Sequence, residues 1–436
     1  MLSFPPSPKS YRRALTCADK RSFFMKNLCF SPADILLPDF QVTDGTRWAC
    51  IACDQFTSEE DYWKETERLV GDAPSTLRMI LPELYLGRED ERRIDAIHKA
   101  MEAYKGSVLK RHPDSLIYLR RTCPTGKVRE GLVGKIDLEA YDYMKGAVSP
   151  VRATEGTVLS RIPPRVAVRR GAPLEAPHVM LLIDDAENTV FGGLAEEQGT
   201  PAYAFDLMQG GGSVSGTFLG DAAKTRVLSA LASLAEGKEN PLLFAVGDGN
   251  HSLASAKAYY EEIKAKIGVE AAKSHPARYA LAEVVNIHSE ALVFEPIYRV
   301  VFGADREALL SEMRAFAERQ TAGESQEVTV VYEKNGVCKE KFTFEHSAHT
   351  LTVGTLQIFL DEYAARHPEI EVDYIHDEAS LVSLATRKDA VGFLFDGMQK
   401  EELFPAVDRD GALPRKTFSM GVAREKRYYL ECREIV

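Results

Sequence analysis

The sequence has no hydrophobic run long enough to cross a membrane. A transmembrane helix needs about 20 consecutive, mostly apolar residues, whereas the most apolar stretches here, 179–183 and 242–246, have the length of buried strands. The first 24 residues combine prolines with basic residues and lack the apolar segment of a secretory signal. We therefore expect a cytoplasmic protein with no membrane partner, and a disordered N-terminal extension over residues 1–24.

Cysteine is sparse and irregularly spaced. The seven cysteines are an odd number without a framework pattern, which suits a reducing compartment and excludes a disulfide-stapled domain. Cys50 and Cys53 form a CxxC pair, but no second pair completes a structural zinc site. Residues 54–57 also separate this pair from the next helical run, unlike a redox motif. We expect both cysteines in a strand.

An excess of positive charge is missing as well. The chain has 54 Lys and Arg against 65 Asp and Glu, giving a net charge of −11. Proteins that bind nucleic acids draw most of their affinity from cationic side chains that neutralise phosphates. The charge balance therefore argues against a general nucleic-acid binder.

The composition is that of an ordinary globular protein, since 45% of its 436 residues are hydrophobic and 27% are charged. Short apolar runs alternate with helical periodicity, which predicts an α/β fold of mixed α+β character with mixed sheets. We expect a main α/β domain over residues 25–300, which carries the site, and a smaller C-terminal α+β subdomain over residues 301–436 packed on it. Four glycines within residues 209–216 predict either a loop with unusual backbone angles or a mobile lid there.

The strongest local signal is the segment Gly247-Asp-Gly-Asn-His-Ser252, between an apolar strand and a helix. Glycines allow a tight turn, and the backbone N–H groups at a helix N-terminus attract phosphate or carboxylate. Gly249, Asn250 and Ser252 would contact that anion. Asp248 could act as a base or bind a metal ion, and His251 could transfer a proton or hold a phosphate oxygen. Alternatively, Asp248 caps the turn and Ser252 caps the helix.

A second cluster places arginines beside a glutamate. Arg152 and Glu155 are followed by Arg161, Arg165 and Arg169. If a helix begins at the prolines between them, Arg165 and Arg169 share one face. Such guanidinium groups could clamp an anionic substrate next to Glu155 as the base. The alternative is a solvated basic face paired with surface acids.

Two weaker signals complete the candidates. Lys416, in the segment Leu413-Pro-Arg-Lys-Thr-Phe418, could bind a phosphate or a carboxylate. Asp54, in the segment Cys53-Asp-Gln-Phe-Thr-Ser58, and the pair Asp184 and Asp185 are further carboxylates, although such residues more often cap turns.

Together these segments resemble a known family. The motifs at residues 53–58, 152–157, 247–252 and 413–418, together with His376-Asp-Glu378, occur in the order typical of the bacterial and archaeal domain of unknown function 1015 family. The resemblance covers most of the chain from about Ser31 onward. The family's name supplies no activity.

The turn at residues 248–252 is also similar to the Asp-Gly-His-Xaa-Arg turn of the ParB/sulfiredoxin-like fold. That fold includes nucleotide-binding partition proteins, sulfiredoxin and an archaeal kinase of free serine. The resemblance implies a ParB/sulfiredoxin-like core, with Asp248 and His251 facing a phosphate or a metal and Glu155 as a base. The chain departs from the pattern at Asn250 and Ser252, which replace a histidine and an arginine, and at Tyr298, which replaces a histidine.

These observations favour an enzyme that acts on a small anionic metabolite. A nucleotide-dependent phosphotransferase similar to a serine kinase, using Mg²⁺ with ATP or ADP and Asp248 as the metal ligand, is the leading hypothesis. A non-catalytic nucleotide- or metabolite-binding regulator is the alternative. A nucleic-acid-associated, ParB-like protein is a third, against which the net charge argues.

Overall fold

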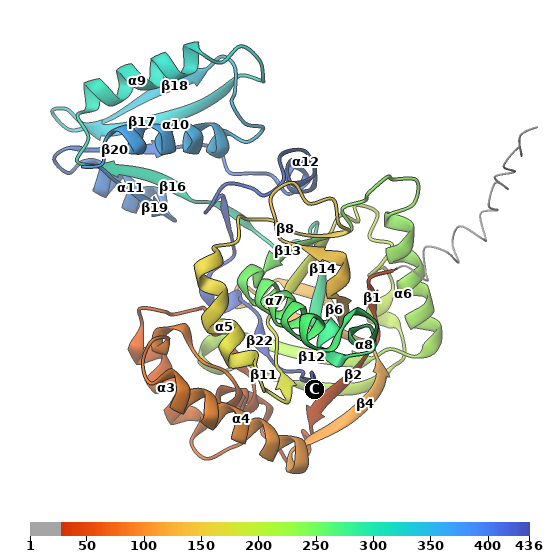
Figure 1. Ribbon diagram of the computed structural model, residues 1–436. Helices are drawn as coiled ribbons and strands as arrows, with labels where there is room; N and C mark the ends of the chain where they lie inside the picture. The colour runs from red at the N-terminus through yellow and green to blue at the C-terminus, as the bar shows by residue number, and fades with distance from the viewer. Residues whose placement is uncertain (1–27) are drawn as a thin grey trace, which may run out of the picture.

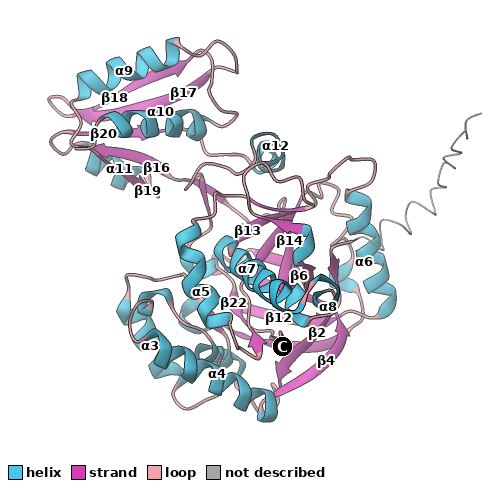
Figure 2. Cartoon of the chain, in the orientation of Figure 1, coloured by secondary structure: helices cyan, strands magenta, loops and turns pink. Residues whose placement is uncertain are grey.

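The computed structural model describes residues 28–436 (Figure 1). The extension expected at residues 1–24 lies outside this range. Helices and strands are interspersed along the chain and build one large mixed sheet and several small ones, which confirms the predicted mixed α/β class (Figure 2). The ParB/sulfiredoxin-like core stays a prediction. Within residues 28–436, no helix is both long and apolar enough to cross a membrane.

The larger of two bodies is built on a ten-stranded sheet. Its centre consists of β13, β10 and β14, whose mostly apolar residues are buried, as in sheets covered on both faces. β14 pairs in parallel with β10 and antiparallel with β6, so the sheet is mixed. In spatial order the strands are β11 (Thr200–Asp206), β12 (Ser213–Phe218), β5 (Ile117–Thr122), β6 (Val128–Asp137), β14 (Tyr279–Asn286), β10 (Met180–Ile183), β13 (Phe244–Asp248), β8 (Val151–Ala153) and β7 (Tyr141–Asp142), with β1 (Phe30–Ser31) beside β6.

Helices cover this sheet and extend the body. Val227 and Leu231 of α6 and Leu253 and Tyr260 of α7 belong to one core with the central strands. α5 packs against α7 (Figure 1). A second core, around Trp48, joins the N-terminal helices to the same body. The helices are α2 (Gly45–Trp48), α3 (Glu60–Val70), α4 (Asp90–Ser107), α5 (Ile162–Arg169), α6 (Asp221–Leu234), α7 (Asn250–Ile267) and α8 (Val269–Ala272).

The smaller body is an antiparallel five-stranded sheet with three helices. Phe316 of α9, Phe359 of α10 and Val330 of β17 share its apolar core. The strand order is β18 (Val337–Phe344), β17 (Gln326–Glu333), β20 (Ala390–Leu394), β16 (Tyr298–Phe302) and β19 (Glu371–Ile375), and the helices are α9 (Arg306–Glu318), α10 (Thr352–Arg366) and α11 (Glu378–Ala385).

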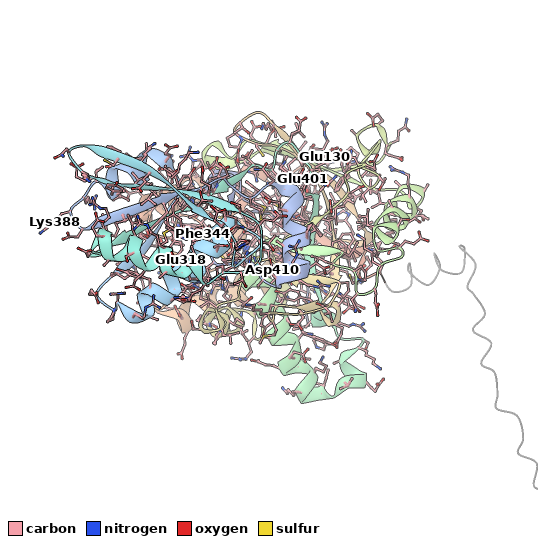
Figure 3. All side chains as sticks on the ribbon, turned by 90° about the horizontal axis from the view of Figure 1, so that it is seen from above. Glu130, Glu318, Phe344, Lys388, Glu401 and Asp410 are labelled. Atoms are coloured by element: carbon pink, nitrogen blue, oxygen red, sulfur yellow. The ribbon has the colours of Figure 1, made fainter. Side chains whose placement is uncertain are left out.

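The chain returns to the larger body after α12 (Lys400–Asp410). Seen from above, α12 lies between the tip of the smaller body at Lys388 and the larger body (Figure 3). The next strand, β21 (Phe418–Met420), pairs with β15 (Phe294–Pro296) at the junction. Then β22 (Tyr428–Tyr429) pairs with β3 (Cys50–Ile51), and β23 (Arg433–Glu434) pairs with β9 (Leu174–Glu175). The last residues, which we expected to belong to the C-terminal part, therefore pair with strands of the N-terminal half.

The glycine-rich stretch at residues 209–216 is not a free loop. Its second half lies in β12, which is hydrogen-bonded to β11 on one side and β5 on the other. The glycines are needed for close packing, since a Cβ on Gly212 would lie 2.0 Å from the Thr122 carbonyl oxygen. A Cβ on Gly216 would collide with the Tyr203 ring at 2.5 Å. The backbone at Gln209, Gly210 and Gly212 has positive φ values of 55°, 73° and 82°, so the predicted loop with unusual backbone angles is confirmed and the alternative of a mobile lid was wrong.

Candidate functional site

A cavity of about 790 Å³ lies where β13, α5 and α7 meet the returning C-terminal segment. Both bodies contribute to its wall, the smaller one through His376. The polar lining residues include Asp54, Thr154, Glu155, Arg161, Arg165, His178, Asp248, Asn250, His251, Ser252, His376, Lys416 and Lys426. Most of the candidates from the sequence therefore share one cavity.

The turn at residues 247–251 has the predicted strand–turn–helix form. Gly249 is the N-cap of α7 with φ +78°, a left-handed conformation that glycine adopts readily. A Cβ there would approach the Cα of Val179 to 3.1 Å, so no larger residue fits without strain. Because α7 begins at Asn250, Ser252 lies inside its first turn and is not the cap. The helix N-terminus thus opens onto the cavity without a side-chain cap.

Asp248 carries an unsatisfied oxygen. Its Oδ1 accepts a hydrogen bond from the Gly249 N–H at 3.0 Å, while its Oδ2 is buried without a hydrogen-bond partner. The Lys426 ammonium lies 3.5 Å from Oδ2 and supplies the nearest positive charge. The sequence did not predict Lys426 as a site residue, because it lies outside every motif. It reaches the cavity only through the pairing of β22 with β3.

Glu155 follows β8, and a backbone bridge to Leu413 holds it at the cavity wall. The Leu413 N–H also donates to the Thr154 carbonyl oxygen at 2.7 Å. Burial raises the pKa of the Glu155 carboxyl, while the nearby ammonium groups of Lys416 and Lys426 oppose that shift. A carboxylate whose pKa is shifted upward is better suited to accept a proton near neutral pH.

Lys416 has an unusual backbone. Its φ is +56°, which costs an L-residue other than glycine about 1–2 kcal/mol. The residue is exposed, lines the cavity and acts electrostatically on Glu155. Strain of this kind gathers at functional sites, where the surrounding structure maintains it.

His251 lines the cavity but is bound to the backbone. Its Nε2 accepts a hydrogen bond from the Val158 N–H at 3.2 Å. Burial, together with Arg165 and Arg161, lowers the pKa of His251 to about 4. The ring is therefore neutral at pH 7, and its contact anchors the loop after Glu155. Proton transfer by His251, as expected from the sequence, has no support in this geometry.

The arginines predicted to bind the substrate differ in their partners and in whether they line the cavity. Arg165 is paired with Glu83, and Arg169 with Glu175, so both are already neutralised. Arg161 is exposed at the cavity wall. Arg152 lies elsewhere, since its guanidinium binds the Asp408 carboxylate at 2.7 Å and the Asn240 carbonyl oxygen at 2.8 Å.

The side chain of Asn250 points back toward β13 and β8. Its Nδ2 lies 3.4 Å from both Thr154 Oγ1 and the Val246 carbonyl oxygen. Its Oδ1 is buried without a hydrogen-bond partner, like the Oδ2 of Asp248. The Lys426 ammonium compensates Asp248 Oδ2 as an ion pair, whereas Asn250 Oδ1 has no such partner, and a buried acceptor is expensive to leave unpaired.

Comparison with known proteins finds distant structural likenesses. A conserved hypothetical protein from Pyrococcus furiosus has 12% identity and a TM-score of 0.33, covering 66% of this chain and 90% of that one. A free serine kinase mutant in complex with AMP has 13% identity and a TM-score of 0.38, covering 72% and 94%. Truncated SbnI from Staphylococcus aureus has 12% identity and a TM-score of 0.34, covering 66% and 82%. At these values the likenesses carry no argument about this chain.

A search of curated proteins finds no significant match. In contrast, one family model matches residues 37–363, which is most of the chain, and confirms the resemblance inferred from the motifs. The chain belongs to the DUF1015 family, described as a protein of unknown function.

Proposed function

We propose that this protein is an enzyme that binds a small phosphorylated or carboxylated metabolite in the cavity and transfers a phosphoryl group from a nucleotide. The observation that carries the proposal is the meeting of Glu155, Asp248, Lys416 and Lys426 at the open N-terminus of α7. Oriented backbone N–H groups and ammonium groups favour an anion there. A carboxylate with a raised pKa beside them is suited to take a proton from a hydroxyl group.

In this mechanism the anion lies against the turn at residues 248–251, with Lys416 and Lys426 neutralising its charge. The acceptor hydroxyl oxygen forms a bond to the terminal phosphorus of ATP or ADP. The bond from that phosphorus to the leaving phosphate breaks, and the hydroxyl proton passes to Glu155. Catalysis of this kind relies on positioning and on electrostatic stabilisation.

Magnesium fits this site in a limited way. Among residues 28–436 there is no group of three or more His, Cys, Asp or Glu side chains arranged to hold a metal. Mg²⁺ is commonly bound by one or two carboxylates, waters and the substrate's phosphates. The Oδ2 of Asp248, which accepts no hydrogen bond and lies 3.5 Å from the Lys426 ammonium, offers one such ligand. When bound, Mg²⁺ would neutralise phosphate oxygens.

A thermal-shift screen tests the proposal. Purified protein is heated with nucleotides, sugar phosphates and amino acids, each with and without Mg²⁺. A ligand at 100 times its Kd stabilises the fold by about 2.7 kcal/mol, which raises Tm by a few degrees. Compounds that raise Tm are then incubated with ATP or ADP, and the phosphorylated product is measured by mass spectrometry.

Asp248→Asn is the decisive variant. The amide oxygen keeps the hydrogen bond from Gly249, so the fold is retained, but the charge beside Lys426 is lost. We expect product formation to stop, while the surface variant Asp221→Asn behaves like the wild type. Equal turnover in Asp248→Asn would refute the role of Asp248. Saturable binding without product would favour a regulatory binding protein.

A further inference from the structure

A carboxylate that the proposed reaction does not use also faces the cavity. Asp54 lies in the turn after β3, and 30% of its side chain is exposed. Asp54 belongs to the segment at residues 53–58, one of those that carry the family resemblance. The proposed roles of Glu155 and Asp248 leave this third carboxylate without a function.

Asp54 is held by side chains and caps no turn. Its Oδ1 accepts a hydrogen bond from the Gln55 Nε2 at 3.0 Å, and its Oδ2 lies 3.6 Å from the His178 Nε2. Asp44 shows the contrast, since it accepts hydrogen bonds from the Thr46 and Arg47 N–H groups as a helix N-cap. The carboxylate of Asp54 is therefore oriented by the side chains of Gln55 and His178 and does not cap the backbone.

His178 is the residue that fixes this arrangement. It is 3% exposed, and its Nδ1 lies 2.7 Å from the Tyr429 hydroxyl, which in turn accepts the Cys53 N–H at 3.2 Å. The ring atom bonded to Nε2 is close to the anion turn, the turn at residues 248–251, because a Cβ on Gly249 would lie 3.4 Å from the His178 Cδ2. Asp54 and the anion turn therefore face adjacent atoms of one imidazole ring, and both line the same cavity, so one small molecule can contact them together.

The environments of two carboxylates in the cavity shift their pKa values in opposite directions. Burial raises the pKa of Glu155. Burial alone would do the same for Asp54, but His178 and Gln55 outweigh it and hold the pKa of Asp54 well below its usual range. Carboxylates whose pKa values are shifted in opposite directions take different roles. Glu155 can accept a proton, whereas Asp54 stays ionised and can only accept hydrogen bonds.

The donor that suits Asp54 is a neutral hydroxyl group. An ammonium group would add positive charge where His178 already faces the carboxylate and Lys426 acts on it. A hydroxyl group gives a charge-assisted hydrogen bond without that repulsion. The 3.6 Å separation between Asp54 and His178 is longer than a direct hydrogen bond, so the carboxylate retains capacity for a further donor.

We propose that Asp54, oriented by His178, binds a hydroxyl group of a small hydroxylated phosphate ester whose phosphate lies at the turn of residues 248–251. This inference rests on the proposed anion site and adds the substrate class. Asp54 contacts the ligand, and His178 is a positioning residue.

Two probes that differ only in their hydroxyl groups test it. Glycerol 3-phosphate and n-propyl phosphate share a phosphate ester and a three-carbon chain, and only the first carries hydroxyl groups. Binding of each is measured by isothermal titration calorimetry with the full chain. We expect the wild type to bind glycerol 3-phosphate about tenfold more tightly, as a hydrogen bond to a charged group gives.

In Asp54→Asn that preference should fall to about threefold or less, with n-propyl phosphate bound as well as before or better, because a negative charge has been removed. Asp221→Asn removes a charge from the exposed first turn of α6 and should keep the full preference. Equal loss for both probes would show that Asp54 only supports the fold, and would overturn the inference.

His178→Gln separates positioning from packing. We expect it to reduce the preference for glycerol 3-phosphate and to remove that preference's dependence on pH. In the wild type we expect the preference to change with pH as His178 loses its proton. Asp54 and Asp248 raise the pKa of His178, whereas burial and Arg427 lower it. An unchanged preference and pH profile would overturn the role of His178.

The two probes distinguish failure of the anion site from failure of the hydroxyl assignment. If the wild type binds both probes equally, the anion site stands and the hydroxyl assignment is wrong. If it binds neither probe, the anion site and the inference built on it are both wrong.

Discussion

Arg299 Nη2 donates a hydrogen bond to the carbonyl oxygen of Arg415 at 3.0 Å, directly before the cavity lysine Lys416. Arg299 lies on β16 of the smaller body and is fully buried. Its Nε donates to the Gln357 Oε1 at 2.8 Å. One guanidinium therefore couples the smaller sheet to the segment that brings Lys416 to the site.

Replacing Arg299 with lysine should destabilise the protein and weaken the site. A lysine presents a single ammonium group and leaves buried acceptors unpaired, at a cost of about 2–4 kcal/mol. Urea denaturation measures this loss, and n-propyl phosphate titration should show weaker binding because Lys416 is less well held. Arg319→Lys, at an exposed pair with Glu362, should change stability by less than about 0.5 kcal/mol. Equal effects of the two variants would contradict the coupling.

Lys416→Gly should preserve or increase stability while weakening anion binding. Glycine removes a left-handed strain of about 1–2 kcal/mol and costs about 0.5–1 kcal/mol in backbone entropy. We expect a net gain of up to about 1 kcal/mol in denaturation, with looser binding of n-propyl phosphate. Asn335→Gly, at φ +57° in the β17–β18 turn, is the matched control and should leave binding unchanged. Unchanged binding in Lys416→Gly would exclude the lysine from the site.

The stability contributed by His178 should decline as the pH rises. Burial opposes its charge, but the Asp54 carboxylate outweighs burial and raises the pKa of His178 above the ordinary value of 6.5. The folded state then holds a proton that the unfolded state releases above pH 6.5, so the contribution is complete below that pH and is lost above it. The difference in unfolding free energy between the wild type and His178→Gln should shrink as the pH rises above about 6.5. Parallel curves in urea denaturation would contradict the raised pKa.

The local structure of the anion turn could be predicted from the sequence alone. An apolar run, two glycines and a following amphipathic segment fix β13, the turn and α7 through interactions between near neighbours. The α5 helix at Pro163 follows from the same local rules. The motifs also identified the family.

The partners within the site could not be predicted in this way. His251 was assigned to chemistry, yet its Nε2 is occupied by the Val158 N–H. Arg152 was assigned to the substrate, yet it binds Asp408. Each partner is brought in by folding of a distant segment, which no local pattern encodes. The glycines at residues 209–216 left a mobile lid open as an alternative, because the Tyr203 ring that packs on Gly216 is brought there only when the sheet folds.

The sequence by itself determined the mixed α/β class, the family and the strand–turn–helix at residues 247–252, since these depend on periodicity and backbone preferences over a few residues. Only the tertiary structure decided that Asp54 and His178 stand beside that turn with Lys426. Tyr429 reaches Cys53 and His178 because β22 pairs with β3, close to the opposite end of the chain. Such contacts arise from burial and strand pairing between remote segments, whose energies no short stretch of sequence records.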